Sequence, residues 1–206
     1  MTELLKIHPV NPELRKIGQV ANIIRRGGLV VYPTDSCYAF GFHMGDKAAT
    51  REIQRVRQTP KSHNFTLVCR DLAEIATYAR VENWCYRLLK AHTPGPYTFI
   101  LTATRTVPRR LQNPKRKTVG IRVPDHPVPQ ALLAELNEPL MSSSLKLPGD
   151  ELPMTDTNEM LVRLQGDVEL IIDSGSCGIE PTTVVDLTGD FPVVVRKGKG
   201  DDRDFL

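Results

Sequence analysis

The chain has 206 residues, of which 40% are hydrophobic and 25% are charged, and its formal net charge is +3. These values are typical of a folded globular protein, and the length allows one sizeable core but is short for two independent domains. No apolar run approaches the roughly 18 residues that cross a bilayer, and the first residues lack the basic start and apolar stretch of a signal peptide. We therefore expect a soluble, cytoplasmic protein with a single domain over residues 1–206.

The four cysteines are widely separated in the sequence. They form no C-x-x-C pair and have no clustered histidine partner; they are Cys37, Cys69, Cys85 and Cys177. This spacing favours free, buried thiols in a reducing compartment over disulfides or a structural zinc site.

Helical and strand patterns alternate along the first half of the chain. Asn11 and Pro12 have the residue types of a helix cap and a first helical position, and apolar residues then recur at helical spacing until Gly27-Gly28. The patterns that follow predict a strand at 29–32 that is buried on both faces, a helix at 46–57 capped by Asp46, a strand at 65–69, a helix at 71–79 with Asp71 and Glu74 at capping-box spacing, and a helix at 82–91.

The second half continues the alternation. Its patterns predict strands at 97–102, 118–123, 140–143, 168–173, 183–187 and 192–196, and helices at 107–111, 127–136 and 157–164. The segment 147–156 is rich in proline, glycine and acidic residues, and we predict that it is a mobile loop. The alternation indicates an α/β fold with a central sheet that is partly parallel, covered by helices, and mixed because consecutive strands occur near the C-terminus.

Charge is unevenly distributed along the chain. From Asn83 to Pro124 there is no acidic residue, and this stretch holds nine cations: Arg87, Lys90, Arg105, Arg109, Arg110, Lys115, Arg116, Lys117 and Arg122. From Asp125 to Phe191 acidic residues dominate. The basic stretch is a candidate surface for polyanions, and a solvated loop and helix face explains it about equally well.

Several common site motifs are absent. The sequence has no Walker P-loop, Rossmann glycine pattern, H-E-x-x-H or G-x-S-x-G motif. A metal centre or a hydrolase-type nucleophile is therefore not supported. The candidate site is inferred from weaker local features.

Two of these features lie at strand ends and within strands. The segment Tyr32-Pro33-Thr34-Asp35-Ser36 directly follows a buried strand, where open α/β sheets bind ligands, although a plain turn explains it slightly better. Period two then puts Arg122 on the same sheet face as Gly120, opposite Val119, Ile121 and Val123, and Arg196 ends a similar strand. An arginine on a sheet face suits a phosphate or carboxylate, and an ion pair with an acid such as Asp125 or Asp186 is about as good an explanation of Arg122.

Two further features are clusters of short polar or basic side chains. Arg55, Arg57, Thr59, Lys61 and His63 lie at the end of a predicted helix, where they form a candidate phosphate-binding lip. Cations at this place are explained more simply by the helix dipole, and a lone histidine is more often structural. The run Met141-Ser142-Ser143-Ser144, followed by Lys146, offers hydroxyl donors for phosphate oxygens, or else simply a turn.

In this order, the segments resemble the YrdC/YciO-like family, which includes the threonylcarbamoyl-adenylate synthases of tRNA modification. The resemblance runs from about Gly28 to Gly198 and is carried by Tyr32-Pro33-Thr34-Asp35-Ser36, Pro94-Gly95-Pro96-Tyr97-Thr98, Gly120-Ile121-Arg122-Val123-Pro124, Pro181-Thr182-Thr183-Val184-Val185-Asp186 and Val195-Arg196-Lys197-Gly198. The stretches 55–60 and 63–67 look most similar to the YciO branch.

The resemblance implies a twisted, mixed sheet of the YrdC/RibB-like kind with a basic concave face. It also implies condensation of L-threonine, bicarbonate and ATP into threonylcarbamoyl-AMP, with Mg²⁺ accompanying the ATP and no structural metal. Carried over by position, Thr34, His63, Thr98 and Arg122 bind the substrate side, the nucleotide is held by Arg57, Ser142, Ser144, Thr182 and Arg196, and Arg57, Ser144 and Lys146 carry the catalytic positions.

This sequence departs from the synthases at two signatures. Their Lys-x-Arg corresponds here to Arg57-x-Thr59, so that one cation becomes a hydroxyl. Their Ser-x-Asn corresponds to Ser144-x-Lys146, so that an amide becomes a cation. A lysine and an arginine need different geometry at a phosphate site, and the loss of a cation beside the reacting phosphorus slows the reaction.

Two functions compete on these grounds, with an interaction module that has a vestigial cleft as a third. The first is a protein that binds a nucleotide, double-stranded RNA or tRNA in a basic cleft, with weak or no synthesis. Its RNA surface comprises Arg105, Arg109, Arg110, Lys115, Arg116 and Lys117. The second is an active L-threonylcarbamoyladenylate synthase. No aromatic residue interrupts the cations between Arg105 and Arg122, so backbone or shape recognition of RNA is favoured over base stacking there.

Overall fold

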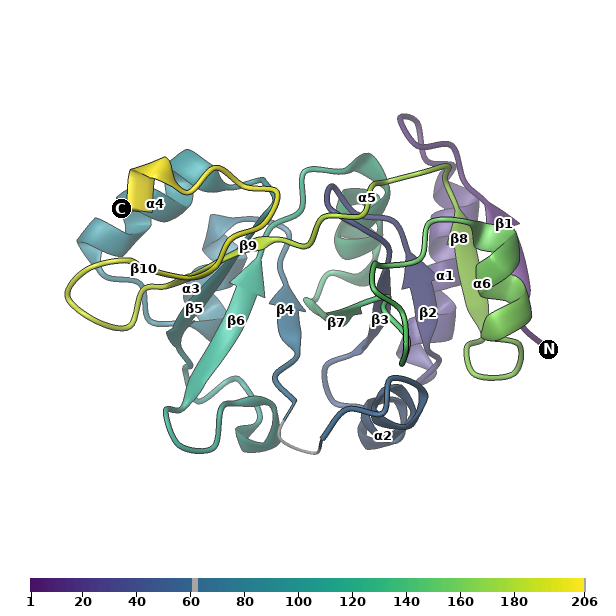
Figure 1. Ribbon diagram of the computed structural model, residues 1–206, viewed down its shortest axis with the longest axis horizontal. Coiled ribbons are helices and arrows are strands. Elements are labelled where there is room, and N and C mark those ends of the chain that lie inside the picture. Colours follow the sequence, from purple (N-terminus) through teal and green to yellow (C-terminus); the bar gives the residue numbers. More distant parts are fainter. Residues whose placement is uncertain (61–62, 206) are drawn as a thin grey trace.

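The computed structural model describes residues 1–60 and 63–205. Ten strands in this part of the chain form one sheet in the order β1-β8-β2-β3-β7-β4-β6-β5-β9-β10 (Figure 1). The strands are β1 (Glu3–Lys6), β2 (Val30–Tyr32), β3 (Ala39–His43), β4 (Thr66–Val68), β5 (Tyr97–Thr102), β6 (Thr118–Arg122), β7 (Leu140–Ser144), β8 (Leu170–Asp173), β9 (Thr183–Asp186) and β10 (Val193–Arg196). The pairs β1·β8, β2·β8, β4·β6 and β5·β9 are parallel and the others antiparallel, so the sheet is mixed, as predicted.

Helices cover the two faces of the sheet unequally. They are α1 (Leu14–Arg25), α2 (Lys47–Val56), α3 (Leu72–Tyr78), α4 (Asn83–His92), α5 (Pro127–Leu136) and α6 (Thr157–Arg163). Helices α1 and α5 pack together and share one core with β2, β7 and β8, whereas α2, α3, α4 and α6 contribute to a second core on the opposite face (Figure 1). Among the helices of the described residues, none is both long and apolar enough to span a membrane.

The strand registers explain why part of one face stays open. In β4, β6 and β5 the buried residues Leu67, Ile121 and Phe99 are paired neighbours and all belong to the second core. Because side chains alternate along a strand, the residues beside them point to the other face. There the sheet carries small or polar residues, such as Thr66 and Gly120, and no helix of the described residues covers this part.

Most predicted elements are present, with ends that differ by one or two residues. The strand at 29–32 is confirmed as β2, and all three of its residues are buried. The predicted helix at 107–111 is a single 3₁₀ turn, η1 (Arg109–Leu111). In the segment 147–156, which has no regular structure beyond turns, Asp150 pairs with Arg163 at 2.9 Å.

Three details of the prediction were wrong. Helix α1 begins at Leu14 rather than at Pro12, and its cap residue is Glu13. The reason is a local turn, because the backbone N–H of Asn11 donates to Nδ1 of His8 at 3.0 Å and the Glu13 carboxylate accepts from the backbone N–H of His8 at 3.0 Å. The strands β1 and β3 were not predicted at all.

Candidate functional site

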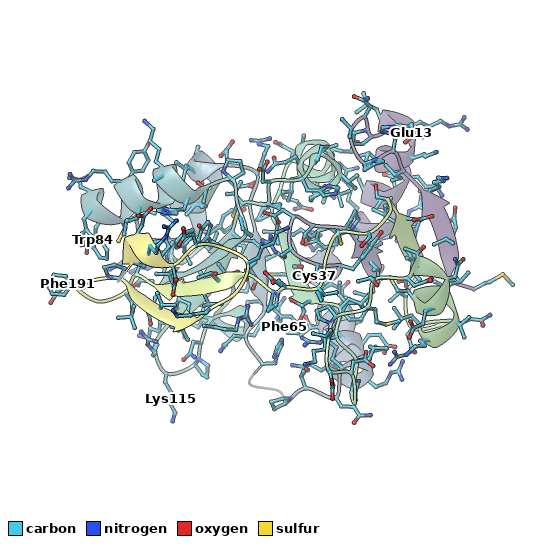
Figure 2. The ribbon with its side chains drawn as sticks, turned by 45° about the horizontal axis from the view of Figure 1, so that its top comes forward. Glu13, Cys37, Phe65, Trp84, Lys115 and Phe191 are labelled. Carbon is cyan, nitrogen blue, oxygen red and sulfur yellow. The ribbon has the colours of Figure 1, made fainter. Side chains whose placement is uncertain are left out.

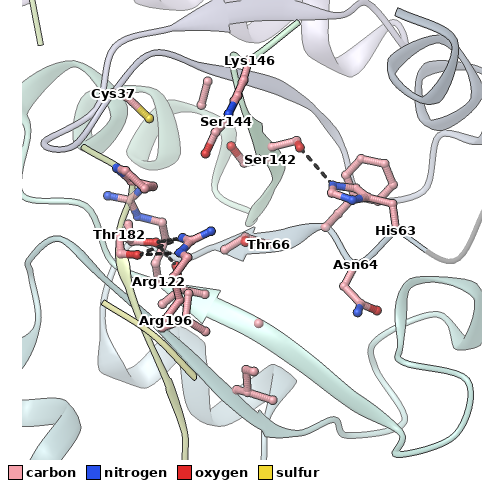
Figure 3. A pocket seen from close by; sticks show the side chains of 18 of the residues that line it. Cys37, His63, Asn64, Thr66, Arg122, Ser142, Ser144, Lys146, Thr182 and Arg196 are labelled. Atoms are coloured by element: carbon pink, nitrogen blue, oxygen red, sulfur yellow. Dashed lines mark hydrogen bonds between the residues drawn. The ribbon is translucent and has the colours of Figure 1, made fainter. Parts of the chain in front are cut away.

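A cavity of about 600 Å³ opens on the uncovered part of the sheet (Figure 3). Its walls are formed by β3, β4, β5, β6, β7, β9 and β10, by the C-terminal end of α2 and by the loops that contain Leu152 and Ile179. The cavity lies on the face that Gly120 and Arg122 share, as the period-two pattern of this strand predicts.

The cavity brings together nine of the residues that the sequence nominated for substrate, nucleotide or catalysis. These are Arg57, His63, Thr98, Arg122, Ser142, Ser144, Lys146, Thr182 and Arg196. They come from positions up to 139 residues apart, since Arg57 and Arg196 are the first and last of them. Lys61, which was grouped with Arg57, lies outside the described residues.

Arg57 follows α2 as its C-cap residue and is fixed by uncharged groups. Its Nε donates to the backbone carbonyl of Lys146 at 3.2 Å, and its Nη1 donates to Oγ of Ser143 and lies 3.2 Å from Nε2 of His63. Burial lowers the pKa of Arg57, and burial together with the Arg57 guanidinium lowers the pKa of His63. An arginine in a protein stays charged despite this shift, and the guanidinium of Arg57 touches no carboxylate of the described residues.

Arg196 ends β10 on another wall of the cavity and is likewise fixed by neutral oxygens. Its Nη2 donates to the backbone carbonyl of Thr182 at 2.8 Å and to Oγ1 of the same residue at 3.3 Å. Oγ1 of Thr182 is also 2.8 Å from Oγ1 of Thr98. Burial lowers the pKa of Arg196, because removing a cation from water without a counter-charge is unfavourable.

Arg122, in contrast, forms an ion pair. It is 7% exposed and donates to the carboxylate of Asp35 and, at 3.2 Å, to Oγ of Ser36. The acids proposed from the sequence were wrong, because Asp125 contributes only its backbone N–H to Asp35 and Asp186 pairs with Arg116 at 2.7 Å. Nε of Arg122 is buried and has no hydrogen-bond partner in the described part of the chain.

The serine strand β7 offers fewer free hydroxyls than its sequence suggests. Oγ of Ser142 accepts from the hydroxyl of Tyr32 at 2.8 Å and donates to the carbonyl of Phe40 at 2.9 Å. Burial raises the pKa of Tyr32 to about 12, so its hydroxyl stays protonated and keeps donating. Ser142 is thus engaged with the sheet, whereas the half-buried hydroxyl of Ser144 has no partner among the described residues.

Thr34 does not line the cavity. It is 2% exposed, and its Oγ1 donates to the carbonyl of Cys37 at 2.6 Å while accepting from the backbone N–H groups of Ser36 and Cys37. These contacts make it the organiser of the turn that places Asp35 beside Arg122.

Besides Arg57, two positions depart from the synthase signatures, and their environments differ. Lys146 is exposed and lines the cavity, and its backbone carbonyl contacts Arg57. Thr59 is absent from the cavity lining, and its Oγ1 is buried without a hydrogen-bond partner in the described residues.

Sequence reasoning missed Ser143, Asp35 and the apolar residues of the rim. Ser143 lies in the nominated serine run, but the family resemblance singled out Ser142 and Ser144. Asp35 is separated from Arg122 by 87 positions, so only the fold reveals the pair. Leu152 and Ile179, which are 56% and 43% exposed at the rim, carry no motif.

The residues nominated for RNA form the loop and 3₁₀ turn between β5 and β6. Arg105, Arg109, Arg110, Lys115, Arg116 and Lys117 are all exposed, and of these Arg116 also lines the cavity. Arg110 donates to the carbonyl of Gly45 at 2.5 Å, which ties this loop to the segment before α2. Lys115 projects into solvent at the outer edge of the molecule (Figure 2).

Comparison with known proteins adds independent findings. The family model for Sua5, YciO and YrdC proteins, described as "Telomere recombination", matches residues 22–198. The crystal structure of Escherichia coli YciO is similar, with 54% identity, full coverage of both chains and a TM-score of 0.96. A threonylcarbamoyl-AMP synthase of Hydrogenovibrio crunogenus is 32% identical over 150 residues, which are 71% of this chain and 80% of the synthase. The structure of Pyrococcus abyssi Sua5 complexed with L-threonine is 28% identical with a TM-score of 0.87, covering 96% of this chain and 58% of Sua5.

Proposed function

The chain is a member of the Sua5/YciO/YrdC family, and we propose that it binds a nucleotide, ATP or AMP, in the cavity by its phosphate groups. One observation carries the proposal. Arg57, which is half-buried, and Arg196 both line the cavity, and each is held only by neutral groups. A partly buried cation without a counter-charge is costly, and a bound phosphate relieves that cost with charge-assisted hydrogen bonds.

The remaining polar groups suit the same ligand. Lys146 adds a flexible cation, and Ser144 adds a hydroxyl donor. Of the described residues that line the cavity, Glu151 alone carries a carboxylate. Carboxylate ligands for Mg²⁺ are therefore scarce in the cavity, and the ion would enter with ATP, bound mainly by its phosphates.

Synthesis of threonylcarbamoyl-AMP from ATP, L-threonine and bicarbonate is the alternative for the same cavity. Thr98, Arg122 and His63 would then bind on the substrate side, and Arg57, Ser144 and Lys146 would stabilise charge on the reacting α-phosphate. We rank this activity as weak or absent, because Thr59 supplies no cation and Lys146 replaces a neutral amide.

Double-stranded RNA or tRNA is the second ligand that we propose, on the exposed basic loop beside the cavity. The observation that favours it is charge: of the six cations, only Arg116 forms an ion pair within the described residues. The others are available to neutralise backbone phosphates, which is the sequence-independent part of nucleic-acid binding.

Isothermal titration of the full chain with ATP and Mg²⁺, with and without threonine and bicarbonate, tests the nucleotide proposal. We expect ATP binding that weakens in Arg57→Gln and is unchanged in Lys90→Gln, an exposed cation of α4 outside the cavity. Absence of ATP binding contradicts the proposal. Tighter binding with threonine, together with pyrophosphate release above a no-protein control, would support the synthase alternative over binding without turnover.

Gel-shift titration with duplex RNA at several salt concentrations tests the second ligand. Replacing Arg105, Arg109 and Lys115 with glutamine should weaken binding. It should also make the slope of log affinity against log salt concentration shallower by about 0.9 for each RNA phosphate that the variant no longer neutralises. The matched control replaces Lys6, Arg15 and Arg26, which are equally exposed on β1 and around α1. Equal effects of the two triple variants, or no binding at low salt, would exclude this loop as an RNA surface.

A further inference from the structure

Arg57, His63 and Ser143 form one hydrogen-bonded unit at the end of α2. Nη1 of Arg57 lies 3.2 Å from Nε2 of His63, the same Nε2 lies 3.2 Å from Oγ of Ser143, and Arg57 donates to that Oγ (Figure 3 shows the His63 imidazole and a dashed line for one of its hydrogen bonds). The His63 ring also makes an edge contact with Phe65, with ring centroids 5.0 Å apart. Both ring position and ring orientation are thus determined by protein groups.

The chemistry of the guanidinium favours one tautomer of this histidine. A guanidinium has donors only, so the contact between Arg57 and Nε2 of His63 is a hydrogen bond only when Nε2 presents its lone pair. A neutral imidazole carries one proton, and in that case this proton is on Nδ1. Burial and the neighbouring guanidinium also lower the pKa of His63, which favours the neutral ring.

We propose that His63 is a positioning residue for Arg57: its neutral Nδ1–H tautomer accepts through Nε2 and, with Ser143, orients the guanidinium toward a bound phosphate. The inference rests on the proposed nucleotide site and changes the role of His63, which the family resemblance had put on the threonine side. Since Nε2 is occupied by Arg57 and Ser143, the ring has no free basic nitrogen to offer a substrate.

The arrangement also accounts for the charge that Arg57 offers. Its Nε and Nη1 are occupied by a carbonyl, a hydroxyl and an imidazole, and its Nη2 has no partner within the described residues. Neutral acceptors hold the guanidinium in place without cancelling its charge, which a carboxylate would do. A rigid arginine loses less conformational entropy on binding, so orientation should appear as affinity.

Two variants separate positioning from a merely structural role. In His63→Gln the amide oxygen can still accept from Arg57, and we expect an ATP·Mg²⁺ affinity within about threefold of wild type. In His63→Leu no acceptor remains, and we expect binding at least about tenfold weaker, the equivalent of about 1.4 kcal/mol. Equal loss in both variants, with both folded by circular dichroism, would overturn the proposal.

Nitrogen-15 NMR of the imidazole tests the tautomer without any ligand. We expect protonated Nδ1, unprotonated Nε2 and a titration midpoint below that of a free histidine, and this midpoint should rise in Arg57→Gln. An Nε2–H tautomer, or a midpoint insensitive to Arg57→Gln, would refute the positioning role even if ATP binds. Absence of ATP binding with the expected tautomer would instead refute the proposed function and with it the phosphate-directing part of the inference.

Discussion

Arg122 and Arg57 both line the cavity, and they contrast in how their charge is balanced. Arg122 is almost fully buried and pairs with Asp35, which also accepts the backbone N–H of Asp125 at 3.1 Å. Arg57 is half-buried and contacts neutral groups only, as does Arg196. The charge of Arg122 is therefore used to hold the turn after β2 against β6, and the charges of Arg57 and Arg196 remain for a ligand. The partner of a cavity arginine, rather than its residue type, distinguishes a structural cation from a ligand-binding one.

Breaking the ion pair between Arg122 and Asp35 should have the largest effect, a loss of stability. Asp35→Asn leaves the Arg122 guanidinium buried without a counter-charge, and we expect the free energy of unfolding to fall by about 3–5 kcal/mol. Urea denaturation measures this loss. The matched control is Asp186→Asn, whose partner Arg116 is 52% exposed in its side chain, so that a loss within about 1 kcal/mol is expected. Similar losses in the two variants would mean that the Arg122 pair is not structural.

Removing the unpaired charges of Arg57 and Arg196 should weaken ligand binding and leave the stability of the protein nearly unchanged. Arg57→Gln and Arg196→Gln should each weaken ATP affinity by about 10- to 100-fold, the equivalent of about 1.4–2.7 kcal/mol, because each loses a charge-assisted hydrogen bond to phosphate. The free energy of unfolding should stay within about 1 kcal/mol of wild type or rise, since a desolvated charge is removed. Titration calorimetry and urea denaturation of the same samples check both statements.

Arg116→Gln is the control for these two variants, because Arg116 lines the cavity but is already paired with Asp186. We expect its ATP affinity to change less than threefold. A decrease as large as that of Arg57→Gln would indicate that the ion pair opens when ligand binds, and the contrast between paired and unpaired arginines would fail.

Restoring the residues of the two synthase signatures tests how the placement of the cavity cations affects catalysis. The triple variant Arg57→Lys, Thr59→Arg, Lys146→Asn restores both signatures, and we expect threonine-dependent pyrophosphate release to rise by about tenfold, the equivalent of about 1.4 kcal/mol in the barrier. Each single substitution should raise pyrophosphate release less than the triple variant does, because the cations act together on one phosphate. No rise, with the triple variant folded and binding ATP, would show that these positions are not what limits the chemistry.

The sequence predicted the alternating elements and the open face of β6, because both follow from local periodicity. It did not predict β3, although four of its five residues are buried. The apolar sequence pattern is interrupted by Gly41, where a Cβ would lie 2.9 Å from side-chain atoms of both Leu140 and Tyr32, so tight packing between strands selects the glycine. Strand β1 is a four-residue edge strand whose pairing with β8 lies far away in sequence.

The site was predictable as a set and less so residue by residue. Nine nominated residues meet in the cavity because the strand registers put polar side chains of β5, β6 and β7 on one face, where the adjoining loops also lie. What sequence cannot supply is the partner of each polar group. Thr34 and Ser142 are short polar residues at strand ends, yet both are satisfied by the protein itself. The Arg122–Asp35 pair and the unit of Arg57, His63 and Ser143 join residues that lie between 6 and 87 positions apart.

The smallest predicted effect concerns Thr59, where the chain lacks the second signature cation. Its buried Oγ1 has no hydrogen-bond partner within the described residues, so Thr59→Val should raise the free energy of unfolding by up to about 1 kcal/mol because an unsatisfied hydroxyl is costly to bury. ATP affinity should not change, since Thr59 is outside the cavity lining. Thr157→Val is the control, because Thr157 is a buried threonine at the first helical position of α6 and is outside the cavity lining. Destabilisation in Thr59→Val together with weaker ATP binding would mean that the Thr59 hydroxyl takes part in the nucleotide site. The ligand-binding groups near Arg57 would then include Thr59.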